Sequence, residues 1–152
     1  MANENIEKFV LHKVERTLGG LKISYSETNK AGETTEITTN FMRPPHPDFD
    51  KVFYCIESAY ERVISPNVEG RFDLVGLTFA GKESNRGVSA SGMLDTVVAV
   101  GAVRIKTRRV KYLISDADIC AKLSLLVPDL EREVQTYIYE GKSAETDDFE
   151  NL

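Results

Sequence analysis

Apolar and polar residues alternate along residues 71–80, which is the pattern of a β-strand with one buried face. The more apolar of the two faces holds Val75, Leu77 and Phe79. A turn sequence at residues 81–87 follows, then a second apolar segment, and residues 104–112 form a further predicted strand that is rich in cations. We therefore expect residues 71–113 to form the centre of a β-sheet.

Shorter strand patterns precede this region. Residues 6–14 fit either a helix or a strand, and we interpret them as a strand. Residues 17–20 form a predicted turn, and residues 21–26 then alternate cleanly between apolar and polar side chains. A second turn at residues 29–32 connects them to residues 34–39, where threonines favour a strand. The pattern predicts an antiparallel meander.

Helical periodicity begins after a group of prolines that ends the first strands. Asp48 is the expected N-cap of a helix that runs to about Ile64. Its apolar positions recur at helical spacing: Val52, Cys55, Ile56, Ala59, Tyr60 and Val63. We expect this face to pack on the sheet.

A second helical pattern follows residue 112, with Asp116 or Asp118 as its expected cap. The expected buried positions are Ile119, Leu123, Leu126, Val127, Leu130, Val134, Tyr137 and Ile138. Pro128 lies inside this run, so we expect either a kink or two abutting helices. Gly141 is the expected C′ residue that ends the helix.

The predicted order is three strands, a helix, three strands and a helix. This order indicates the α+β class: an antiparallel sheet of about six strands with two helices packed on it, βββα-βββα. We expect residues 1–142 to form a single domain and residues 143–152 to form an acidic, disordered tail. The repeated order suggests a structural duplication, although no residues match between the halves.

Composition narrows the class of protein. The chain has 152 residues, 41% hydrophobic and 28% charged, which is typical of a globular domain. A formal net charge of −5 argues against nucleic-acid binding by the whole surface, but a local basic face is compatible with it. Cys55 and Cys120 are interpreted as reduced core thiols. Without a signal peptide or an apolar spanning segment, we expect a cytoplasmic protein that does not bind a membrane.

Enzyme signatures are weak. Residues 76–82 match the spacing of a phosphate-binding loop, but Glu83 stands where a Ser or Thr hydroxyl must reach Mg²⁺. His12 and His46 have no second ligand at metal-binding spacing, and we interpret the loop around His46 as a helix cap. No Ser or Cys has the sequence context of a nucleophile. A catalytic acid–base pair formed by residues distant in the sequence is an alternative, but we expect a protein without catalytic residues, metal or cofactor.

Positive charge is concentrated in one predicted strand. Five cations lie within eight residues: Arg104, Lys106, Arg108, Arg109 and Lys111. In a strand, the first three would share one face at a spacing that can follow a phosphate backbone. Lys82 and Arg86 would extend this row, and Tyr112, Phe79 or Tyr25 would offer surfaces on which bases stack. The alternative is a solvated strand face or a protected sheet edge.

The chain end is acidic with apolar residues among the acids. Its relevant residues are Asp147, Asp148, Phe149, Glu150 and Leu152. This pattern resembles the C-terminal tails of single-stranded-DNA-binding proteins, and that resemblance implies recruitment of replication or recombination proteins and competition with DNA for a basic groove. The alternative is a tail that only increases solubility.

Longer stretches carry a second resemblance. They are residues 45–49, 75–79, 87–92 and 133–144, with the sequences PHPDF, VGLTF, GVSASG and EVQTYIYEGKSA. Together they are similar to a family of small uncharacterised proteins from phages and prophages. The resemblance implies a phage setting, in the cytoplasm of a bacterial host, and favours a strand at residues 8–14 and a helix at residues 134–142. It implies no particular chemistry.

Two functions are therefore expected as alternatives. The first is a non-enzymatic phage accessory protein that binds single-stranded nucleic acid through the basic strand. The second is a protein that binds or sequesters a nucleotide against host signalling, in which Lys82, Arg86 and Arg109 clamp phosphates and a homo-oligomer completes the site. A virion or assembly component is a third alternative. An open basic groove would favour the first, and a closed pocket the second.

Overall fold

The computed structural model describes residues 6–64, 70–96, 101–113 and 117–144. These residues form six strands and two α-helices in the predicted order, so the predicted α+β class is confirmed. The elements are β1 (Ile6–Thr17), β2 (Gly20–Asn29), β3 (Thr34–Phe41), α1 (Pro47–Ile64), β4 (Gly70–Ala80), the 3₁₀ turn η1 (Glu83–Asn85), β5 (Gly87–Thr96), β6 (Val103–Lys106) and α2 (Asp118–Tyr139). The ambiguous N-terminal segment is a strand.

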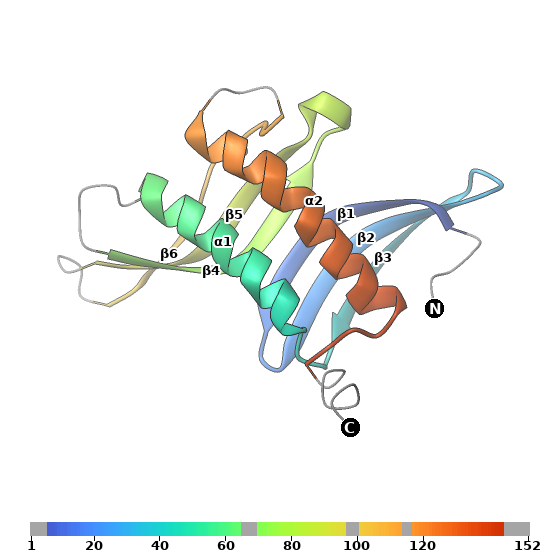
Figure 1. The fold of residues 1–152 in the computed structure, drawn as a ribbon, viewed down its shortest axis with the longest axis horizontal. Coiled ribbons are helices and arrows are strands. Elements are labelled where there is room, and N and C mark those ends of the chain that lie inside the picture. Colours follow the sequence, from blue (N-terminus) through green and yellow to red (C-terminus); the bar gives the residue numbers. More distant parts are fainter. Residues whose placement is uncertain (1–5, 65–69, 97–100, 114–116, 145–152) are drawn as a thin grey trace.

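The sheet consists of two meanders that meet at their first strands. Its order is β3-β2-β1-β4-β5-β6, and all neighbours are antiparallel. Both helices lie across one face, and no described helix covers the other face, which we call the open face (Figure 1). Among the described residues, the two meanders pair only where Lys13–Glu15 faces Gly76–Thr78, and we call these three residue pairs the seam. Beyond them β1 and β4 need other partners for their backbone groups.

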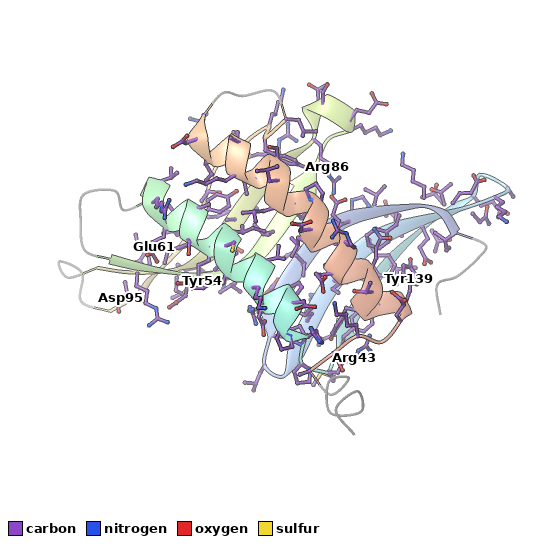
Figure 2. All side chains as sticks on the ribbon, in the orientation of Figure 1. Arg43, Tyr54, Glu61, Arg86, Asp95 and Tyr139 are labelled. Atoms are coloured by element: carbon purple, nitrogen blue, oxygen red, sulfur yellow. The ribbon has the colours of Figure 1, made fainter. Side chains whose placement is uncertain are left out.

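Side chains satisfy the backbone on both sides of the seam. On one side, the Phe72 and Leu74 N–H groups donate to the carboxylates of Glu61 and Glu57 of α1, at 2.9 and 2.8 Å. On the other side, the Arg86 guanidinium donates to the Leu11 carbonyl. Glu61 and Arg86 are labelled in Figure 2. Because unpaired buried backbone groups are costly, these contacts explain how so short a seam persists.

The core lies between the helices and the covered face of the sheet. The buried face of α1 consists of Phe49, Phe53, Ile56, Ala59 and Tyr60. The buried face of α2 consists of Ile119, Cys120, Leu123, Val127, Leu130, Val134 and Tyr137. Cys55 and Val63 are exposed, so the prediction that they face the core is wrong. Compared with the prediction, the buried face of α1 includes Phe49 and Phe53 in place of Cys55 and Val63.

A β-bulge in β4 changes which residues face the core. The register between β4 and β5 shifts between Leu74 and Gly76. Phe72 and Leu74 before the bulge, and Leu77 and Phe79 after it, are all buried. Strict alternation therefore misplaced Val75, which is only half-buried. One extra residue reverses the alternation, so both halves of the strand present their large side chains to the helices.

The N-terminus of α1 is capped by His46, not by Asp48 as predicted. The His46 carbonyl accepts the N–H groups of Phe49 and Asp50, and its Nδ1 accepts the Asp48 N–H at 3.0 Å. The Asp48 carboxylate instead accepts a hydrogen bond from Lys142 Nζ at 2.9 Å. Negative charge in the first helical turn is favourable in either role.

The ends of α2 follow the prediction only in part. Asp118 is the first helical residue and Ala117 is the N-cap, without a side-chain hydrogen bond, while Asp116 lies outside the described residues. The helix is continuous through Pro128, so the alternative of two abutting helices is wrong. Gly141 has φ +69°, the left-handed conformation expected of a C′ glycine.

Candidate functional site

The cations of the predicted strand lie along one edge of the sheet. β6 is the outermost strand, and Arg104 and Lys106 alternate there with Ile105, which packs against the core. The two cations therefore lie on the open face of the sheet. The strand ends at Lys106, so it is shorter than the segment 104–112 predicted.

Residues 107–111 continue along β5 without forming a regular strand. Thr107 donates its N–H to the Ala90 carbonyl and accepts the Ala90 N–H with its hydroxyl, at 2.8 and 2.9 Å. Val110 exchanges two hydrogen bonds with Val88, at 3.0 and 2.9 Å. Arg108 and Arg109 lie between these two attachment points, and both are exposed.

Gly87 allows Arg109 to lie close to the sheet. A Cβ at this position would be 2.6 Å from Cγ of Arg109 and 3.0 Å from the Val110 carbonyl oxygen. A larger residue would push the cationic segment away from β5. The glycine thus fixes where this part of the edge runs.

Together the five cations form what we call the basic edge: Arg104, Lys106, Arg108, Arg109 and Lys111. All five are exposed. Within the part of the chain that the structure describes, none of their side chains takes part in a hydrogen bond or ion pair with another residue. The cations are thus available to an anionic ligand, although cations also protect an exposed sheet edge from pairing with other strands.

Lys82 and Arg86 have different environments, although both were predicted to extend the row. Lys82 is exposed at the start of η1. The Arg86 side chain is only 14% exposed, lies 3.5 Å from the Glu131 carboxylate and stacks over the Phe79 ring at 4.9 Å. Arg86 therefore lies in the interior beside the seam and does not extend the basic edge.

The predicted stacking surfaces are buried in the core. Tyr112, Phe79 and Tyr25 have exposed fractions of 5%, 3% and 6%. All three belong to the core beneath the helices. Burial raises the pKa of the Tyr112 hydroxyl, which agrees with this interior position. The structure does not place these rings where bases bound at the edge would stack.

A cleft of about 400 Å³ opens beside the seam, and we call it the β1–α2 cleft. Its walls come from the first half of β1, the loop around η1, the segment after the basic edge, and α2. Its lining includes Lys8, Phe9, Lys82, Arg86, Leu113 and Glu131. Lys82 and Arg86 were predicted ligand contacts, and Arg109, predicted with them, does not line the cleft. The other four residues come from distant parts of the chain and belong to no local sequence pattern.

Five charged residues line this cleft, namely Lys8, Lys82, Glu83, Arg86 and Glu131, and of these Arg86 and Glu131 are the least exposed. Burial raises the pKa of the Glu131 carboxyl, while the Arg86 guanidinium partly opposes the shift. The Glu131 side chain is 31% exposed, so solvent still reaches it. A guanidinium and a carboxylate therefore stand side by side, a donor next to an acceptor.

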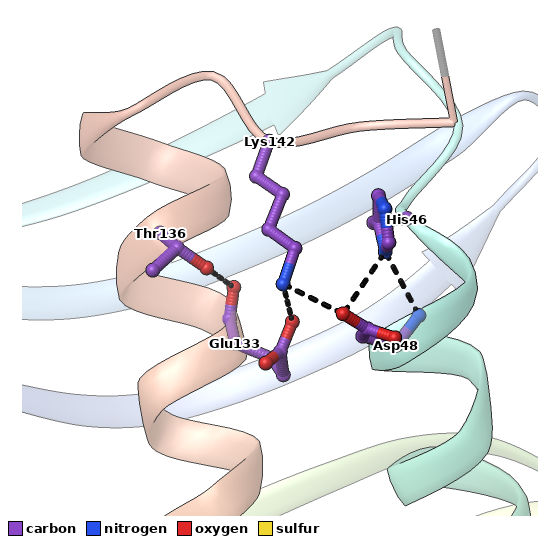
Figure 3. A network of polar contacts seen from close by, with 5 residues as sticks. All are labelled: His46, Asp48, Glu133, Thr136 and Lys142. Atoms are coloured by element: carbon purple, nitrogen blue, oxygen red, sulfur yellow. Dashed lines mark hydrogen bonds and ion pairs between the residues drawn. The ribbon is translucent and has the colours of Figure 1, made fainter. Parts of the chain in front are cut away.

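A second polar cluster joins the start of α1 to the end of α2 (Figure 3). Lys142 Nζ lies 2.9 Å from the Asp48 carboxylate and 3.0 Å from that of Glu133. These contacts lower the pKa of Asp48, chiefly through the hydrogen bond with Lys142. The cluster lies at helix ends and opens into neither the cleft nor the basic edge, so we interpret it as structural.

The remaining candidate groups have ordinary surroundings. His12 forms a hydrogen bond with the Ser26 hydroxyl. Cys120 is buried as predicted, whereas Cys55 is exposed, so its assignment to the core is wrong. Among residues 6–64, 70–96, 101–113 and 117–144, no group of three His, Cys, Asp or Glu side chains is placed to hold a metal ion.

The fold and these sites define an α+β protein with an exposed cationic sheet edge and an adjoining cleft. Comparisons with protein families, with curated proteins and with solved structures find no match to this chain. The helices in the described part of the chain are too short or too polar to span a membrane. The predicted tail residues Asp147, Asp148, Phe149, Glu150 and Leu152 lie outside the described residues.

Proposed function

We propose that the protein binds single-stranded nucleic acid along the basic edge, with Lys82 as a further contact. The observation that carries this proposal is the exposure of all five edge cations, which have no acidic partner among the described residues. The binding is non-enzymatic. The phage setting, the cytoplasmic location, homo-oligomerisation and recruitment of other proteins through the tail stay predictions.

Geometry supports contact with the phosphate backbone. Side chains on one face of a strand repeat every two residues, about 6.6 Å apart, so Arg104 and Lys106 present a regular pair of charges. Arg108, Arg109 and Lys111 continue the charge along the edge. Since the chain as a whole carries a formal charge of −5, attraction of a polyanion depends on this local concentration of cations.

The same geometry predicts how the complex behaves. The rings expected to stack are buried, so phosphate contacts dominate the binding energy. Binding should then depend steeply on salt and little on sequence. An extended edge of modest length favours a flexible single strand, which can follow the irregular course of residues 107–111, over a rigid duplex.

The test measures fluorescence anisotropy of a labelled oligothymidylate and of a duplex. The edge triple variant replaces Arg104, Lys106 and Arg108 with Ala, and a control triple variant replaces the exposed residues Lys22, Lys30 and Lys51. Both variants change the net charge equally. We expect the edge variant alone to lose affinity for the single strand. Equal losses in the two variants, or unchanged affinity in the edge variant, would contradict the proposal.

A further inference from the structure

The mouth of the β1–α2 cleft is built from a fixed loop. Gly81 has φ +89°, and a Cβ there would lie 2.5 Å from the Asn85 carbonyl oxygen. Glu83 adopts φ +54°, a conformation that residues other than glycine rarely occupy. Two backbone hydrogen bonds, from Asn85 to Lys82 at 3.0 Å and from Arg86 to Glu83 at 3.1 Å, close the loop. The mouth is therefore formed before any ligand arrives, and strained backbone of this kind concentrates at binding sites.

The polar groups inside the cleft suit a ligand that carries a hydrogen-bond acceptor next to a hydrogen-bond donor. The Arg86 contacts to Leu11 and Glu131 both involve Nη2, and a guanidinium has five N–H donors in all. Glu131 Oε1 faces Arg86, and a carboxylate accepts hydrogen bonds at both oxygens. A ligand group that accepts from Arg86 while donating to Glu131 would satisfy both residues. The edges of nucleobases present such neighbouring acceptors and donors.

The remaining walls suit a flat apolar body with an anionic end. Phe9, Val127 and Pro128 line the cleft, and Leu113, with an exposed fraction of 53%, lies at its rim. Lys8 and Lys82 are both exposed, and in the described part of the chain neither forms an ion pair. Apolar walls with a few placed polar groups are typical of small-molecule sites, and about 400 Å³ falls within their usual range of roughly 300–1,000 Å³.

We propose that the β1–α2 cleft binds one nucleotide, with its base against Phe9 and toward Arg86 and Glu131, and its phosphate on Lys8 and Lys82. This site does not depend on the basic edge for its geometry. The nucleotide is either free or part of a strand bound at the edge, because the segment after Lys111 leads directly into the cleft wall through Tyr112 and Leu113.

The experiment is isothermal titration of the full chain with GMP, AMP and ribose 5-phosphate as probes. Leu113→Trp fills the rim of the cleft, Lys82→Ala removes a phosphate contact, and Val63→Trp on the exposed surface of α1 is the matched control. We expect saturable binding of at least one nucleotide, weakened at least tenfold by Leu113→Trp and several-fold by Lys82→Ala, with no change in Val63→Trp. Circular dichroism checks that each variant is folded.

Three results would overturn the proposal: no saturable nucleotide binding, equal affinity for ribose 5-phosphate, or unchanged affinity in Leu113→Trp. The edge triple variant separates the two sites, since it should lose oligothymidylate and keep the nucleotide. If the basic edge does not bind oligothymidylate, the cleft should still bind the nucleotide. If the cleft does not bind a nucleotide, the edge should still bind oligothymidylate. Loss of oligothymidylate affinity in Leu113→Trp would assign the nucleotide to the bound strand, and its retention would assign it to the free pool.

Discussion

Replacing Arg86 with Met removes the guanidinium beside the seam and keeps an unbranched apolar stem. The Leu11 carbonyl then loses its donor, Glu131 loses the cation 3.5 Å away, and Phe79 loses the stacked charge. Met still covers the Phe79 ring, so little apolar burial is lost. The variant therefore isolates the polar contacts that hold the two meanders together.

The expected cost follows from these three contacts. A buried carbonyl without a partner costs about 1–3 kcal/mol. The ion pair is worth about 1 kcal/mol, because Glu131 is 31% exposed and solvent screens it. The cation–π contact contributes about 0.5–1 kcal/mol. We expect Arg86→Met to lower the free energy of unfolding by about 3 kcal/mol, which for a chain of this size lowers Tm by about 6–12 °C.

Urea unfolding followed by circular dichroism measures this loss. Arg71→Met is the matched control, since the Arg71 side chain is 80% exposed and its removal should change stability by less than about 0.5 kcal/mol. The double variant Arg86→Met with Glu131→Gln should be less destabilised than the sum of the single variants, by about 1 kcal/mol. A loss below about 0.5 kcal/mol in Arg86→Met would refute the assigned role.

Three further predictions concern the basic edge, the cleft and the sheet. The five cations of the basic edge and Lys82 make about six phosphate contacts, so the logarithm of the affinity for a single strand should fall with the logarithm of salt concentration at a slope of about −4. In anisotropy titrations the edge triple variant should reduce this slope to about −2. The folded-state pKa of Glu131 lies above its unfolded value, so its stabilising contribution is complete below the unfolded pKa and disappears as the pH rises through the folded pKa. Glu131→Gln should therefore remove this part of the pH dependence of the free energy of unfolding, measured by urea unfolding at graded pH. Gly92→Ala should destabilise the fold by about 1–3 kcal/mol, because its Cβ would lie 2.2 Å from the Asp73 carbonyl oxygen; an unchanged urea midpoint would show that the sheet adjusts freely.

The fold class followed from periodicity because each element has one buried face. Alternation identified the strands, and three- and four-residue spacing identified the helices. Periodicity gave a wrong assignment where a β-bulge changes the phase of the alternation between buried and exposed residues. The bulge before Gly76 moved Val75 off the core face, and a change of that kind leaves no mark in a pattern of apolar and polar residues.

The sites were harder to predict than the fold. Exposed and interior cations look alike in a sequence, so Arg86 was grouped with Lys82 although only Lys82 is exposed. What separates them is the Leu11 carbonyl, a backbone group that needs a donor only because β1 and β4 part there. The cleft likewise depends on residues from both meanders and α2, which only the tertiary structure brings together.

The short seam also determines how the molecule can deform. Three residue pairs join the halves, whereas each meander has long ladders of its own. Rotation of one half against the other would break few sheet hydrogen bonds, but it would also have to shear the single core and the helices that span both halves. The cleft lies beside the seam and takes its walls from both halves and from α2, so amide exchange at the seam should slow when a ligand binds there.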